Sequence, residues 1–219
     1  MIREVAAPDV VAGRLRALCS GEPTYVAPRL LGAVLTHGGV SLRLTEVEAY
    51  CGSTDPGSHA FRGPTRRNAS MFGPPAHLYA YFIYGMHTNV NVVCGPAGIA
   101  GGVLLRAGEV VAGVEEARTR RGDVAPRDLA RGPARLAQAL GFGLTDDGMD
   151  LAGLLEPRSR SVPRRLIRTG PRVGLRAAAD RPWRFWLDGD PTVSAYRPAA
   201  RVRRGADRAV SGPAQATTP

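Results

Sequence analysis

Glu46 and Glu48 stand two residues apart in a stretch that alternates apolar and polar side chains. Because alternate side chains of an extended strand share one face, we expect one face to carry Leu42, Leu44, Glu46, Glu48 and Tyr50. Two carboxylates on a partly enclosed surface repel each other and lose solvation, which raises the pKa of one of them and suits it to general-base catalysis near neutral pH. The same spacing also fits a solvated strand with both charges outside, and it does not choose between the two glutamates.

A second cluster is aromatic and lies within residues 77–84, in a chain that is only 6% aromatic. Tyr79 and Tyr81 share one face of the expected strand, and Tyr84 stands beside Gly85 at its end. A buried tyrosine needs a hydrogen-bond partner for its hydroxyl, so tyrosines gathered next to a turn indicate a stacking or wedging surface, with Tyr84 exposed. Other members of the segment must belong to the core.

The remaining reactive residue types predict neither a metal nor a cofactor. The four histidines have no ligand spacing, and the three cysteines are far apart with no Cys-x-x-Cys pair, which also points to a reducing compartment. The glycine-rich segment 95–102 lacks both a phosphate-binding lysine and the Gly-x-Gly-x-x-Gly pattern of dinucleotide sites.

The chain is strongly basic, with a formal net charge of +10 over 219 residues, and every basic residue is an arginine. This excess favours a polyanionic partner, either nucleic acid or an anionic membrane surface, although a codon bias toward arginine produces the same composition. No apolar run approaches the ~18 residues of a membrane helix, and the first residues lack the apolar core of an export signal. We therefore expect a cytoplasmic protein that is not inserted in a membrane.

Hydrophobic periodicity and turn residues predict a mixture of helices and strands. The stretch 52–75, rich in Gly, Pro, Ser and Arg, predicts a functional loop. One domain over residues 1–196 and a mobile Arg, Ala and Pro-rich tail over 197–219 account for the length. The expected helices are 8–20, 114–121 and 133–140, and the expected hairpins pair 30–36 with 41–50, 77–84 with 89–94, and 183–187 with 192–196, with one further strand at 103–111.

Seven short motifs, in order, resemble the alkyladenine (3-methyladenine) DNA glycosylase family. Together they extend over roughly residues 20–196, which makes a chance match improbable. The motifs are Thr45–Tyr50, Arg66–Phe72, Leu78–Met86, Val103–Ala107, Arg131–Leu140, Arg172–Gly174 and Trp183–Phe185.

The resemblance implies an α/β (α+β) fold: a single compact domain with a curved, mostly antiparallel β-sheet, surrounding helices and a protruding hairpin that enters the DNA minor groove. It also implies a monomeric enzyme without a cofactor, whose partner is double-stranded DNA containing damaged purines. Such an enzyme flips an alkylated or deaminated purine out of the duplex and hydrolyses its N-glycosidic bond, leaving an abasic site.

The resemblance also assigns roles around the reacting bond. Glu48 matches the glutamate that holds and deprotonates the attacking water, and Glu46 becomes a bystander. Arg106 matches the arginine that orients this glutamate and the water, and the backbone carbonyl of Val173 matches a further contact of the water.

Five further residues match the family's contacts with the flipped base and the duplex. Tyr50, His59 and Tyr81 match the side chains that sandwich the flipped purine, where electron-rich rings favour a cationic methylated base. Asn91 matches the asparagine at the floor of the pocket, where its amide collides with the 2-amino group of guanine. Tyr84 matches the wedge that fills the vacated gap in the duplex.

Two departures and two alternatives accompany the resemblance. The hairpin tip at 86–89 is more polar than in the family, and the loop at 93–102 is slightly longer, which affects the position of Arg106. A catalytically silent binder of damaged DNA and an RNA-binding domain of the same fold are the alternatives, but neither needs the full set of matched residues. Because the chain contains no lysine for a Schiff base, we expect a monofunctional glycosylase.

Overall fold

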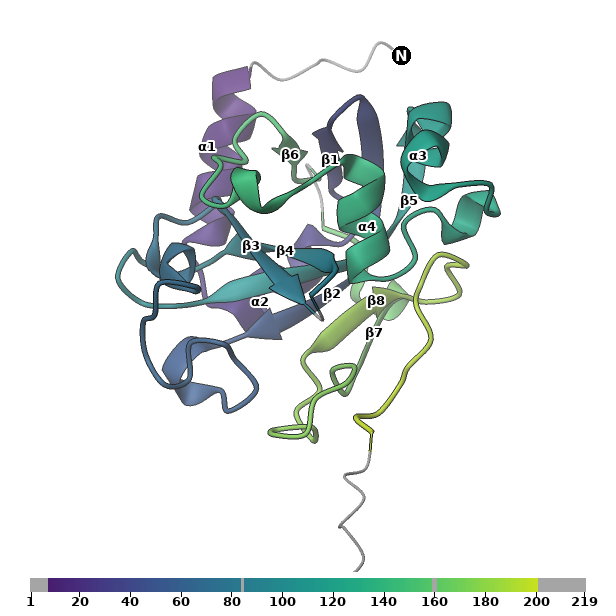
Figure 1. Cartoon of the computed structure of the whole chain (residues 1–219). Coiled ribbons are helices and arrows are strands. Elements are labelled where there is room, and N and C mark those ends of the chain that lie inside the picture. The colour runs from purple at the N-terminus through teal and green to yellow at the C-terminus, as the bar shows by residue number, and fades with distance from the viewer. Residues whose placement is uncertain (1–7, 84, 159–160, 201–219) are drawn as a thin grey trace, which may run out of the picture.

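A computed structural model describes residues 8–83, 85–158 and 161–200, in which helices pack on one antiparallel sheet (Figure 1). This confirms the predicted fold class. The boundary between domain and tail at residue 197 stays a prediction, and 201–219 lie outside the described residues. The helices are α1 (Pro8–Cys19), α2 (Pro23–Leu30), α3 (Val114–Arg121) and α4 (Pro133–Leu140), and the strands are β1 (Val34–His37), β2 (Val40–Tyr50), β3 (Leu78–Ile83), β4 (His87–Val93), β5 (Gly102–Ala112), β6 (Leu155–Glu156), β7 (Ile167–Gly170) and β8 (Arg184–Leu187).

The strand order along the sheet is β3-β4-β5-β2-β1-β6, with β8 pairing with both β2 and β7. The long strands β2 and β5 cross the middle of the sheet, and every strand pair is antiparallel (Figure 1). The predicted hairpin of β3 and β4 is present, with Tyr81 opposite Asn89 and Tyr79 opposite Asn91.

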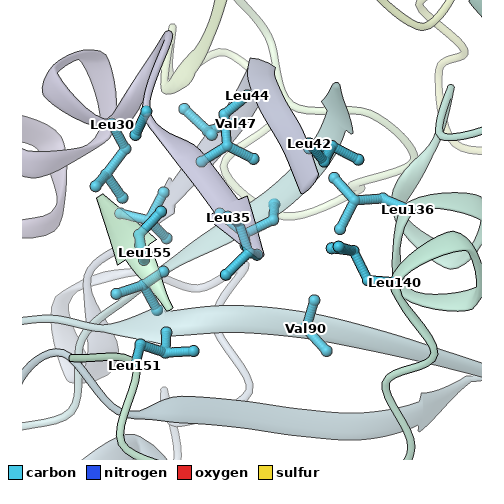
Figure 2. Packing of buried hydrophobic residues seen from close by; sticks show 14 of the residues in the cluster. Leu30, Leu35, Leu42, Leu44, Val47, Val90, Leu136, Leu140, Leu151 and Leu155 are labelled. Atoms are coloured by element: carbon cyan, nitrogen blue, oxygen red, sulfur yellow. The ribbon is translucent and has the colours of Figure 1, made fainter. Parts of the chain in front are cut away.

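The main hydrophobic core lies between one face of the sheet and the helices. Leu136 and Leu140 of α4 meet Leu42 of β2 and Val90 of β4 in this core (Figure 2). Helix α4 presents these leucines because they stand four residues apart, and it ends where Gly141 adopts a left-handed backbone conformation. Full burial of one such leucine stabilises the fold by about 2 kcal/mol.

A β-bulge interrupts the pairing of β2 with β5. Leu44 lies opposite Gly108 and Glu46 lies opposite Ala107, so Thr45 has no partner residue on β5. A second shift between Glu46 and Val47 follows directly. One unpaired residue in a strand exchanges the two faces for all residues beyond it.

The bulge makes the expected single face of β2 wrong. Before it, Leu42 and Leu44 belong to the main core, and after it the core residue is Val47. Glu46 and Glu48 therefore leave the leucine face and lie on the opposite side of the sheet. An uninterrupted alternation would bury both carboxylates among leucines, where their charges have no partner.

The predicted strand at 30–36 is shorter than expected: Leu30 ends helix α2, a turn follows, and β1 starts only at Val34. Pro23 occupies the first turn of α2, where its missing N–H leaves no intrahelical bond unmade. Val26 and Leu30 stand four residues apart and are both buried, which gives α2 an apolar face against β2.

The predicted hairpin between 183–187 and 192–196 is wrong. Strand β8 pairs with β7 and β2, and 192–196 form no strand. Polar groups of this last segment bind buried residues instead of pairing with a strand. The Thr192 hydroxyl contacts the Thr45 hydroxyl at 2.8 Å, and the Ser194 backbone N–H donates to Glu46 at 2.7 Å.

No helix within the described parts of the chain is long and apolar enough to cross a membrane. Across the same residues, no three side chains of His, Cys, Asp or Glu come together as a metal site.

Candidate active site

A cavity of about 600 Å³ opens on the face of the sheet opposite the main core. Its walls come from strands β2 to β5, the 52–75 loop, and the segments around residues 173 and 195. Six of the eight residues assigned by resemblance line it: Tyr50, His59, Tyr81, Asn91, Arg106 and Val173. Of the other two, Glu48 lies buried behind the wall, and Tyr84 lies outside the described residues.

Glu48 is completely buried, and both of its carboxylate oxygens are held. Oε1 accepts the backbone N–H of Val173 at 2.7 Å and lies 3.4 Å from Nη1 of Arg106, while Oε2 accepts the Tyr50 hydroxyl at 2.9 Å. Burial raises the pKa of Glu48, against the opposing effect of Arg106. A carboxylate with a raised pKa beside a cavity is a suitable proton acceptor.

Val173 contacts the site through a different backbone atom from the one that the resemblance emphasised. Its N–H binds the Glu48 carboxylate and fixes the orientation of that side chain. The predicted contact between the Val173 carbonyl and a water stays a prediction.

Glu46 is equally buried but is held by more donors. Oε1 accepts hydrogen bonds from Nε of Arg106 at 2.8 Å, Nε of Arg184 at 2.7 Å and the Ser194 hydroxyl at 2.9 Å, and Oε2 accepts the Ser194 backbone N–H. Burial by itself would raise the pKa of Glu46, but Arg106 and Arg184 bring it below its ordinary value. Glu46 is therefore an ionised structural anchor, which is a larger role than that of a bystander.

Arg106 links the two glutamates. Its Nε donates to Glu46, and its Nη1 lies within ion-pair distance of Glu48. Arg106 has no partner residue on β2, and it lies on the cavity face of β5 because it alternates with the core residue Leu105, as Leu104 does. Arg106 lines the cavity, and its role in orienting Glu48 and a water stays a prediction.

Aromatic rings form one wall of the cavity. The His59 ring meets Tyr81 edge-on with centroids 4.5 Å apart, and Tyr79 stacks on Tyr81 at 5.4 Å. Burial lowers the pKa of His59, and the neighbouring Arg67 lowers it further, so the ring is neutral near pH 7. A neutral ring beside two tyrosines can accommodate a cationic planar ligand without charge repulsion.

A buried ion pair between Asp55 and Arg172 stands behind Tyr50. Nη2 of Arg172 donates to Asp55 at 2.7 Å, and Nη1 donates to the Ala49 carbonyl at 2.9 Å. The guanidinium carbon lies 4.6 Å from the centre of the Tyr50 ring. This pair fixes the 52–75 loop and the backbone next to Val173 against β2.

Sequence reasoning did not identify Asp55, Arg184 or Ser194. Arg184 and Ser194 reach Glu46 from distant parts of the chain, and no local spacing connects them with it. Asp55 had one available signal, a lone acid in a loop otherwise rich in small and basic residues, which would need a buried cation.

Comparison with known proteins identifies the family of the chain. The sequence model of one family, described as methylpurine-DNA glycosylase, matches residues 17–191. A protein of Leifsonia xyli, assigned as a 3-methyladenine DNA glycosylase, is 57% identical over 189 residues, covering 78% of this chain and 87% of its own. Proteins with the same assignment from Corynebacterium efficiens and Nocardia farcinica are both 52% identical, covering 82% and 83% of this chain and 94% and 90% of their own.

Proposed function

Because the chain belongs to the methylpurine-DNA glycosylase family, whose members are hydrolases of N-glycosyl bonds in DNA, we propose that it flips damaged purines out of duplex DNA and releases them with a water that Glu48 activates. The observation that carries this proposal is the environment of Glu48: a buried carboxylate of raised pKa, held by two hydrogen-bond donors and an ion pair with Arg106 behind the wall of a cavity lined with aromatic rings.

The reaction follows from the atoms around Glu48. Oε2 accepts one hydrogen bond, from the Tyr50 hydroxyl, and has capacity for a second, which we assign to the attacking water. Glu48 takes a proton from the water as its oxygen bonds to C1′ of the sugar, and the N-glycosidic bond breaks with its electron pair leaving on the base. Arg106 keeps Glu48 ionised and aligned until this transfer.

The cavity supplies selectivity for the base. We infer that Tyr50, His59 and Tyr81 sandwich the flipped purine, with a cation–π contribution of about 0.5 to 2 kcal/mol for a methylated base. Asn91 lies on the cavity side of β4 with its Nδ2 bound to the Tyr79 carbonyl at 3.2 Å. This anchored amide is the proposed barrier to the 2-amino group of guanine.

Tyr84 completes the proposal as the wedge that fills the gap in the duplex. Its own placement lies outside the described residues, but it directly follows β3, whose Tyr81 lines the cavity. The working unit that we propose is a cytoplasmic monomer acting on damaged double-stranded DNA. Replacing Tyr84 by Ala should then weaken binding to a lesion in duplex DNA more than binding to the same lesion in a single strand.

A panel of lesion duplexes tests the proposed function. Incubation with DNA containing 3-methyladenine, 7-methylguanine, hypoxanthine or ethenoadenine should release at least one free base and leave abasic sites. Binding of these duplexes without release of any base would favour the catalytically silent binder instead.

A second experiment tests the monofunctional chemistry. The chain has no lysine to form a Schiff base with C1′, so borohydride added during turnover should trap no covalent protein–DNA adduct. Strand cleavage before alkali treatment, or a trapped adduct, would contradict hydrolysis by water.

A further inference from the structure

Asn89 lies on β4 directly opposite Tyr81, on the same side as Asn91, and it lines the cavity. Its side chain is buried, with 4% of the residue exposed. Nδ2 donates to the Tyr81 hydroxyl at 3.2 Å, whereas Oδ1 has no partner. Among residues 8–83, 85–158 and 161–200, Oδ1 of Asn89 is the one buried side-chain oxygen without a hydrogen bond.

A buried amide oxygen without a donor is unfavourable, and such atoms in folded proteins usually have a partner. As the amide is oriented, Nδ2 donates to the Tyr81 hydroxyl and Oδ1 is left free. Two further rings that line the cavity, those of Tyr79 and His59, hydrogen-bond to each other at 3.2 Å. Because Asn89 lines the cavity, an occupant of the cavity can supply the missing donor.

We propose that Asn89 is a specificity-determining residue, whose Oδ1 accepts an N–H from the Watson–Crick edge of the flipped purine. This inference rests on the proposed function, since it concerns the base that the cavity receives. Only an acceptor is offered, so the residue favours lesions that retain an N–H at position 1 or on the 6-amino group.

Three lesions test the proposed hydrogen bond whichever way the base is turned in the cavity, because they differ in the N–H donors on the Watson–Crick edge. In 3-methyladenine the 6-amino group keeps its N–H donors, and in hypoxanthine N1 keeps one. In ethenoadenine the etheno bridge joins N1 to N6, so no N–H remains on that edge. The loss of Oδ1 should therefore slow the release of the first two bases and not of the third.

The experiment compares single-turnover release of the three bases by the parent chain and by Asn89→Leu, which keeps the bulk of the side chain and removes the acceptor. We expect release of 3-methyladenine, of hypoxanthine, or of both to slow about tenfold, and release of ethenoadenine to change less than about threefold. Asn89→Ala, which adds no bulk, should show the same pattern if leucine disturbs the hairpin. Gln138→Leu removes an amide from α4 outside the cavity, and it should alter none of the three rates.

Equal losses on all three lesions, or the largest loss on ethenoadenine, would overturn the role of Asn89. Retained ethenoadenine release by the variants shows that the fold and Glu48 still work, so a selective loss supports the proposal. Release of none of the bases by the parent chain would instead overturn the proposed function.

Discussion

Glu46 and Glu48 lie on the same face of β2, and both are fully buried, yet their surroundings move their pKa values in opposite directions. Glu46 has two arginines within 3 Å and two bonds from Ser194. Glu48 shares one of those arginines at a longer distance and otherwise has neutral donors. The comparison teaches that burial alone does not make a catalytic carboxylate: the number of cations in contact decides whether the group stabilises the fold or accepts a proton.

The largest expected effect is that of Glu48→Gln on catalysis. The amide keeps the shape of the side chain but cannot accept the proton of water, so single-turnover release should fall by about 10² to 10⁴-fold while binding of lesion DNA is largely kept. Release within tenfold of the parent rate would remove the basis for distinguishing the two glutamates.

Glu46→Gln should lower the stability of the fold more than the rate of base release, the opposite of Glu48→Gln. It removes the negative charge that faces Arg106 and Arg184 in the protein interior, so the free energy of unfolding should fall by about 3 kcal/mol, measured by urea denaturation. Base release should fall far less than in Glu48→Gln. A variant as stable as the parent would show that Glu46 is not the anchor.

The pH dependence of base release should report Glu48. Because burial raises the pKa of Glu48, the protonated, inactive form persists above the ordinary glutamate pKa of about 4.3, and activity should rise with pH through this higher value. The charge of Glu46 contributes to raising the pKa of Glu48. Glu46→Gln should therefore move the acidic limb, the low-pH side of the pH–rate profile, to lower pH. An unmoved limb in that variant would mean that another group controls it.

The smallest effect is expected from Tyr50→Phe. The lost hydroxyl donates to Oε2 of Glu48 and lowers the pKa of that carboxyl, so its removal should shift the acidic limb slightly to higher pH, opposite to Glu46→Gln. Single-turnover rates of the parent and of both variants across pH 4 to 8 measure the two shifts on the same pH scale. A shift in the same direction in both variants would be inconsistent with the arrangement around Glu48.

Elements with strong local patterns could be predicted from the sequence. Helix α3 and helix α4 have the expected bounds, and the hairpin of β3 and β4 lies where alternating residues flank Gly85. Helix α2 escaped prediction because it is short and contains Pro28, a residue that disfavours a helix interior, so its tertiary contacts with β2 decide the outcome.

The site likewise combines residues that a local motif identifies with contacts that only the folded chain reveals. The position of Glu48 beside a cavity could be predicted from the motif that contains it, whereas the contacts that distinguish it from Glu46 come from Arg184 and Ser194, more than 130 residues away in the chain. The spacing of the two acids contains no information about such partners. Asn89 was also not predicted as a functional residue, because only the pairing with Tyr81 reveals its free oxygen.

Thr45 has no part in the chemistry, yet the placement of both acids depends on its presence. Substitution changes only a side chain that contacts Thr192, whereas loss of the residue would restore the alternation and turn two carboxylates into the leucine layer. The position of Thr45 should therefore tolerate substitution better than deletion over evolutionary time. Its tolerance would be the reverse of that expected for the surface loops, where insertions and deletions are usually accepted.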